Sequence, residues 1–138
     1  MFPCRPASLT REVILPQGRT QVVMHACSAA GSTFALASLT ASDVGAVTAM
    51  IDSLRDAAAR NVAAAESGSV RPFEVPGMTP NAHAGRQALQ GRRPDGSAVV
   101  EHLLVFARGT RVYQASVLGD APAEAAVSSF FDGLKVLQ

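Results

Sequence analysis

The residues best suited to bind a metal are three histidines and one of the two cysteines. His25 and Cys27 stand two positions apart, whereas His83 and His102 lie far along the chain. Zinc is held by three or four converging ligands, which usually come in close-spaced pairs. His-x-Cys is not a recognised pair spacing, and alternation in the surrounding sequence places His102 on the core-facing side of its strand. We therefore expect structural histidines, with no metal and no other cofactor.

Residues for nucleophilic or acid–base catalysis show no recognised arrangement. The chain has no G-x-S-x-G turn and no glycine-rich phosphate loop. Paired carboxylates would have to come from Glu74, Asp95 and Glu101, and the Pro-Asp-Gly turn already accounts for Asp95. A triad of distant residues is defined by geometry, so the sequence leaves it open. The enzyme alternative that we keep is a small enzyme with a site around Glu101, Gln114 and neighbouring arginines.

Arginines are concentrated between residues 71 and 111, while residues 42–67 and 112–138 are each net acidic. Five of these arginines fall on adjacent predicted strands and turns: Arg86, Arg92, Arg93, Arg108 and Arg111. Guanidinium groups bind carboxylates and phosphates well. This group, with Glu101 and Gln114 beside it, is the candidate surface for a ligand or an acidic partner. The alternative is that these side chains only keep the surface soluble.

Length and composition indicate one folded domain. The chain has 138 residues, of which 48% are hydrophobic, and a net charge of +1. Its mean hydropathy is +0.19. Such a chain can build a core without metal or disulfide support. The near-zero charge argues against binding to nucleic acid or to an anionic membrane, both of which need clustered positive charge.

Cys4 and Cys27 are the only cysteines, and they show neither CxxC spacing nor a larger cysteine framework. We expect two free thiols. No signal peptide precedes them, so we expect a cytoplasmic protein, or a periplasmic one if the chain is a trimmed form. The uncharged stretch at residues 20–42 contains many polar residues and is expected to form two strands and a turn, not a membrane span.

Alternating apolar and polar residues predict about six strands after a loose leader at residues 1–8. The expected strands are 12–15, 20–28, 33–40, 85–90, 97–107 and 111–118, with a further short one at 70–75. A two-residue turn at Gly109-Thr110 places Arg108 opposite Arg111 and Phe106 opposite Tyr113. Both faces of this last hairpin are substantially apolar, so we expect both to be covered.

Two helices are predicted. The first spans about 43–66, with Ser42 or Asp43 as its cap. Its buried stripe is expected to contain Val44, Val47, Ile51, Leu54, Ala58, Val62 and Ala65. The second spans about 121–132, with Asp120 as its cap and Gly133 at its end. Phe130 and Phe131 are consecutive residues of this helix and cannot both point the same way. One of them is therefore expected to be partly exposed, and an exposed phenylalanine suggests a possible homodimer.

The order of these elements resembles PsbP-like domains. The residues that carry the resemblance are Arg111-Val112-Tyr113-Gln114, Gly119, a short helix introduced by proline, Phe130-Phe131-Asp132-Gly133-Leu134, Val75-Pro76-Gly77 and Gly85-Arg86 before the Pro-Asp-Gly turn. PsbP-like domains share an α/β/α sandwich with the small Ran-binding nuclear import factor and with many bacterial proteins. The resemblance, which runs from about Leu9 onward, implies an α/β/α sandwich at residues 9–138. It also implies binding of proteins or small ligands instead of a shared catalytic centre.

The function expected from the sequence is that of a non-catalytic binding domain. Its partner is expected to be a protein or a small ligand, held on a sheet face or in a cleft between helix and sheet. Resemblance of fold does not transmit function, so the site has to decide between this hypothesis and the small enzyme.

Overall fold

Seven extended segments form one antiparallel sheet. The computed structural model describes residues 2–64 and 66–136. Its strands are β1 (Ala7–Leu15), β2 (Gly18–Ala29), β3 (Ser32–Thr40), β4 (Glu66–Ser67), β5 (Gly85–Arg92), β6 (Ala98–Arg108) and β7 (Arg111–Gly119). Their spatial order is β1-β2-β3-β7-β6-β5-β4, and all neighbours run antiparallel. The predicted α+β fold with a mainly antiparallel sheet is confirmed, and the two-residue β4 adds an edge strand to the six expected.

The turn between β6 and β7 fixes their register as predicted. Arg108 pairs with Arg111, and Phe106 pairs with Tyr113, whose ring stacks on it at 5.1 Å. Gly109, the first residue of the two-residue turn, has a φ of +57°. Glycine reaches this left-handed conformation at little cost, and the tight turn leaves a single pairing of the two strands.

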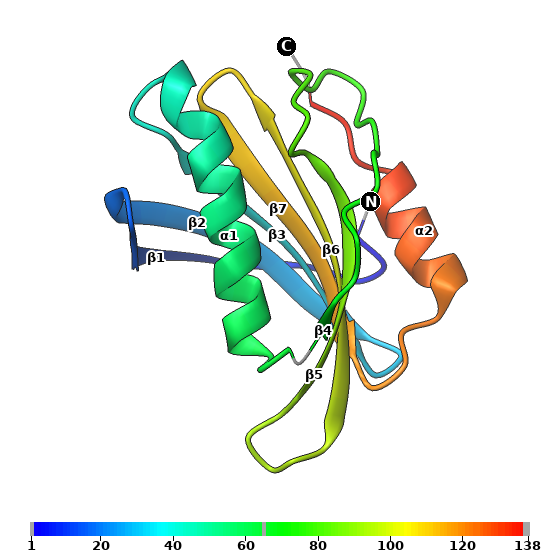
Figure 1. Ribbon diagram of the computed structural model, residues 1–138. Coiled ribbons are helices and arrows are strands. Elements are labelled where there is room, and N and C mark those ends of the chain that lie inside the picture. Colours follow the sequence, from blue (N-terminus) through cyan, green and yellow to red (C-terminus); the bar gives the residue numbers. More distant parts are fainter. Residues whose placement is uncertain (1, 65, 137–138) are drawn as a thin grey trace.

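Each of the two helices is associated with its own apolar core. A 3-10 turn at Val44–Ala46 leads into α1 (Val47–Asn61), and α2 (Glu124–Asp132) lies near the C-terminus. The core beneath α1 contains Leu103, and the core beneath α2 contains the next residue, Leu104. Successive strand residues point to opposite faces, so each strand feeds both cores. The central strands run between the two helices in Figure 1.

The first helix ends earlier than predicted. Asp43 caps its 3-10 start by accepting a hydrogen bond from the Ala46 N–H at 2.9 Å. However, α1 ends at Asn61, not near residue 66. Ala63 has a φ of +48°, which a helix cannot contain, and the chain turns there toward its pairing with β5.

The apolar stripe of α1 is mostly as predicted. The buried members are Val47, Ile51, Leu54, Ala58 and Val62. Val44 is 71% exposed, because it belongs to the 3-10 turn before the helix, and Ala65 lies outside the described residues. Arg55, which is not part of the predicted apolar stripe, is only 8% exposed.

Residues 70–75 do not form a strand. An isolated bridge between Arg71 and Arg86 is the pairing found there. The chain then crosses from β4 to β5 through an irregular segment at residues 72–84, in which Met78 N donates to the Val75 carbonyl at 3.0 Å and Thr79 N donates to the Ala107 carbonyl at 2.8 Å. Pro72, Pro76 and Pro80 in this segment lack the amide donors that a strand needs.

The second helix is also shorter than predicted. It starts at Glu124, its cap residue is Ala123 without a side-chain hydrogen bond, and Gly133 ends it as expected. Asp120 does not cap the helix, because its carboxylate binds Arg93 at 2.5 Å.

Both phenylalanines of α2 are buried, so the expectation of a partly exposed one was wrong. Phe130 is 2% exposed and Phe131 is fully buried. The ring of Phe130 contacts that of Phe2 at 5.2 Å, and the ring of Phe131 contacts that of Phe73 at 6.3 Å. The N-terminal segment and the crossing segment therefore cover α2, and the exposed ring that suggested a homodimer is absent. Among the other apolar residues in and beside this helix, Ala123 and Ala126 are exposed and Leu134 is half-buried.

The two cysteines form a disulfide, which corrects the expectation of free thiols. Cys4 and Cys27 have Cα atoms 5.9 Å apart and a sequence separation of 23 residues. β1 begins at Ala7, opposite Ala26, so the residues before it pass beside the end of β2. The segment expected as a loose leader is thus bonded to the sheet, and β1 is longer than the predicted 12–15.

Candidate functional site

A cleft of about 570 Å³ lies between α1 and one half of the sheet. It exists because α1 packs mainly on β6 and β7, while the sheet continues beyond them through β3, β2 and β1. The β1–β2 turn reaches back to the helix, where the Gln17 side-chain amide donates to the Ser53 hydroxyl at 3.1 Å. Sites for small molecules typically have volumes of this order.

Most of the residues that line the cleft are apolar, and they come from both the sheet and the helix. Those from the sheet are Val13, Ile14, Leu15, Val22, Met24, Ala37, Leu39 and Leu118, and those from the helix and its end are Leu54, Ala57, Ala58 and Val62. The five polar lining residues are Arg11, Arg60, Asn61, Glu101 from β6 and Gln114 from β7. An apolar hollow with few polar groups is typical of a ligand site.

Glu101 is the acidic residue of the cleft, and it is only 8% exposed. Burial raises its pKa to about 7, because the charged form loses water. Among the described residues, Arg55 Nε is the sole fully buried side-chain polar atom that lacks a hydrogen-bond partner. The carboxyl group of Glu101 forms no ion pair with a described residue. It is therefore free to interact with a molecule bound in the cleft, which Glu101 lines.

Gln114 lines the same cleft, but at a distance from Glu101. It pairs with Val105, whereas Glu101 pairs with Leu118, four residues further along β7. At about 3.4 Å per residue, the two backbone positions are roughly 14 Å apart along the strand. The structure therefore brings these two predicted site residues to one cleft without bringing their side chains together as a catalytic pair.

The five predicted arginines do not join them. Arg86, on the α2 side of β5, is near Glu124 at 3.5 Å and lies over the rings of Phe73 and Phe131. Arg93 binds Asp120 in the β5–β6 region. The other three bind backbone or hydroxyl oxygens of their own neighbourhoods: Arg92 that of Gly96, Arg108 that of Gly77 and Arg111 that of Ser38. Arg108 and Arg111 pair with each other at the β6–β7 turn, and none of the five arginines lines the cleft.

Sequence reasoning missed the two arginines that do line the cleft. Arg11 comes from the edge strand β1, and Arg60 comes from the last turn of α1. Both are exposed, and neither is in an ion pair with a described residue. The spacing of Leu9, Arg11 and Val13 could have indicated Arg11, because residues two apart in a strand lie on the same side.

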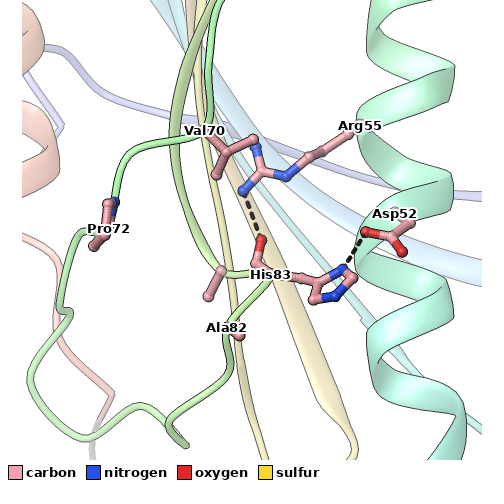
Figure 2. A pocket seen from close by; sticks show the side chains of 7 residues that line it. Asp52, Arg55, Val70, Pro72, Ala82 and His83 are labelled. Atoms are coloured by element: carbon pink, nitrogen blue, oxygen red, sulfur yellow. Dashed lines mark hydrogen bonds and ion pairs between the residues drawn. The ribbon is translucent and has the colours of Figure 1, made fainter.

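A second, smaller pocket of about 290 Å³ lies where α1 meets the crossing segment (Figure 2). His83 Nδ1 is 2.8 Å from Asp52 Oδ1, and both side chains are about half-exposed. A histidine oriented by a carboxylate occurs in catalytic triads, but no serine, threonine or cysteine lines this pocket. The geometry instead indicates an attachment between the segment and the helix.

The buried side chain of Arg55 also links α1 to the end of the crossing segment and the start of β5. Its Nη2 donates to the carbonyl oxygens of His83 at 3.1 Å and Gly85 at 2.8 Å, and its Nη1 is 3.4 Å from Gln87 Oε1. Burial lowers the pKa of Arg55, and the charge of Asp52 acts in the opposite direction. A buried guanidinium whose donors reach backbone carbonyls holds the start of β5 against α1.

The other residues considered for metal binding are dispersed. Cys27 is in the disulfide, His25 is hydrogen-bonded to Ser8 at 2.7 Å, and burial lowers the pKa of the half-buried His102. Over residues 2–64 and 66–136, no three histidine, cysteine or acidic side chains gather into a metal-binding group.

Comparisons with known proteins add no family to this description. No protein-family model matches the chain, and no curated protein or solved structure matches it either. Within the part of the chain that the structure describes, neither helix is long and apolar enough to cross a membrane. The geometry of the cleft therefore carries the functional argument.

Proposed function

We propose that this protein is a non-catalytic domain that binds a small, largely apolar molecule in the cleft between α1 and the β1–β3 half of the sheet. The observation that carries the proposal is the cleft itself: about 570 Å³, lined mainly by apolar side chains, with the buried carboxyl group of Glu101 inside. Apolar surface left open to water is costly, and a ligand that fills the cleft removes that cost.

The shape of the site favours a small molecule over a protein partner. Protein interfaces are usually broad, and their binding energy is concentrated in aromatic or arginine anchors. Here the apolar residues line a hollow, and no aromatic side chain is among them. None of the five arginines proposed as a partner surface lines the cleft, and several of them already bind neighbouring residues.

The small-enzyme alternative has one supporting feature and lacks a second. A carboxyl group with a pKa of about 7 is suited to general acid–base catalysis. However, no serine, threonine, cysteine or histidine lines the cleft with Glu101, and Gln114 lies roughly 14 Å away along the strand. Binding is the simpler use of this arrangement.

We also propose an α/β/α sandwich of the PsbP-like kind, which works in an oxidising compartment such as the periplasm. The sandwich is supported by the two separate cores under α1 and α2. The compartment is supported by the Cys4–Cys27 disulfide, since such bonds persist in oxidising surroundings and are rare in the cytoplasm.

The test of the binding proposal is a titration with octan-1-ol, followed by calorimetry or NMR. Ala57 is half-buried in the cleft wall, so Ala57→Trp fills the cleft without removing a core side chain. The matched control is Ala126→Trp, on the exposed side of α2. We expect saturable binding to the native protein and the control, and at least tenfold weaker binding to Ala57→Trp. Absence of saturable binding, or equal binding by both variants, would overturn the proposal.

A further inference from the structure

Two arginines that form no ion pair with a described residue line the same cleft from opposite sides. Arg11 belongs to the sheet side and Arg60 to the helix side, and both line the cleft while remaining exposed. The ion pairs in the described part of the chain are Arg19–Glu12, His83–Asp52, Arg86–Glu124 and Arg93–Asp120. Neither cleft arginine takes part in them, so their charge is available to something in the cleft.

The interior of the cleft, in contrast, is mainly apolar. Apart from Glu101, the charged lining residues are these two arginines, since β2, β3 and β7 contribute only uncharged ones. Arg55, on the same helix, directs its guanidinium to the carbonyl oxygens at the start of β5. Glu101 itself is buried, and burial favours its uncharged, protonated form. The cleft is therefore apolar within and positive at its exposed residues.

We infer that the ligand of this cleft is an amphipathic anion, whose apolar body lies against the sheet and whose anionic head lies between Arg11 and Arg60. This inference depends on the proposed function, because it names the class of molecule that the same cleft binds. Guanidinium groups are well suited to carboxylate, sulfonate and phosphate heads, which they bind through paired N–H donors.

A cationic amphiphile is the opposite possibility, with its head on Glu101. Such a ligand would have to place its charge near two arginines that repel it. It would also require Glu101 to be ionised in the position where burial disfavours the ionised form. The arrangement of charges thus favours an anion over a cation.

Three probes with the same chain and different heads test this inference. Octane-1-sulfonate is anionic, octan-1-ol is neutral and octylammonium is cationic at pH 6. We expect the dissociation constants to rise in that order. Arg11→Gln and Arg60→Gln should each weaken sulfonate binding roughly two- to fivefold, the effect of one partly exposed ion pair, and leave octanol binding unchanged. Arg71→Gln, on an exposed residue outside the cleft, is the matched control and should change neither.

The outcomes separate the two proposals. If octan-1-ol binds and Ala57→Trp blocks it, but the three heads bind equally or octylammonium binds best, this inference is overturned and the binding function stands. If the two arginine variants bind the sulfonate as tightly as the native protein, the inference is likewise overturned. If none of the three probes saturates the cleft, the proposed function fails as well.

Discussion

Glu101 on β6 lies directly opposite Leu118 on β7, and both side chains line the cleft beside α1. A carboxyl group is thereby placed in a layer of apolar side chains, where its charged form is poorly solvated. The strand pairing that places it there is fixed by the Gly109-Thr110 turn at the far end of the same hairpin. A local turn therefore determines the chemistry of the cleft.

Glu101→Gln should stabilise the protein in alkaline solution. The folded protein keeps the Glu101 proton up to a pKa of about 7, whereas the unfolded chain loses it near 4.5. The native protein therefore loses stability as the pH rises from 4.5 to 7, by up to about 3 kcal/mol. Urea unfolding should show the variant more stable at pH 8 and nearly equal to the native protein at pH 4.5. The control Glu74→Gln, on an exposed loop residue, should change stability by less than about 0.5 kcal/mol at both pH values.

Arg55→Gln should destabilise the protein by about 2 to 4 kcal/mol. The substitution removes the donors to the buried carbonyl oxygens of His83 and Gly85, and unpaired buried acceptors are costly. Chemical denaturation measures the loss, and Arg60→Gln on the exposed side of the same helix should cost no more than about 0.5 kcal/mol. Equal effects of the two substitutions would show that the attachment to β5 contributes nothing.

Reduction of the Cys4–Cys27 bond should lower the free energy of unfolding by about 3 kcal/mol, the value expected for closing a loop of this length. The native protein, denatured without reductant, should show no free thiol in a thiol assay. A Cys4→Ser, Cys27→Ser double variant should have the stability of the reduced protein and no response to reductant. Two reactive thiols in the native protein would contradict both the bond and the proposed oxidising compartment.

Gly91→Ala should be more damaging than Gly96→Ala. A Cβ atom at Gly91 would be only 1.8 Å from the Val62 carbonyl oxygen, which accepts a hydrogen bond from Arg92 N at 2.7 Å. Gly96 has open space around it and only a positive φ of +88°. We expect a cost of about 1 kcal/mol at Gly96 and at least twice that at Gly91. Thermal unfolding of the two variants decides the order.

The sequence predicted best what neighbouring residues determine. The β6–β7 register followed from one glycine turn and the alternation around it, and the cap that Asp43 provides for the 3-10 turn before α1 followed from a single side chain. Glu101 and Gln114 were likewise named together as candidate site residues, and both line the cleft.

Features that depend on distant segments were missed. Arg55 was left out of the predicted buried stripe, because nothing near it in the sequence shows that its guanidinium reaches the carbonyl oxygens of His83 and Gly85. The Cys4–Cys27 bond required knowing that β1 extends back to Ala7. Arg11 and Arg60 meet at one cleft only because the sheet continues past the edge of α1, which no local pattern reveals.

The most direct test of the binding account is an NMR titration of the native protein with octan-1-ol, in which amide shifts identify the residues that respond. The account predicts saturable shifts around the cleft, at Met24, Leu39, Asn61 and Leu118, with the amides of α2 unaffected. Saturable shifts confined to α2 and the face beneath it, or no saturable shift at all, would contradict it.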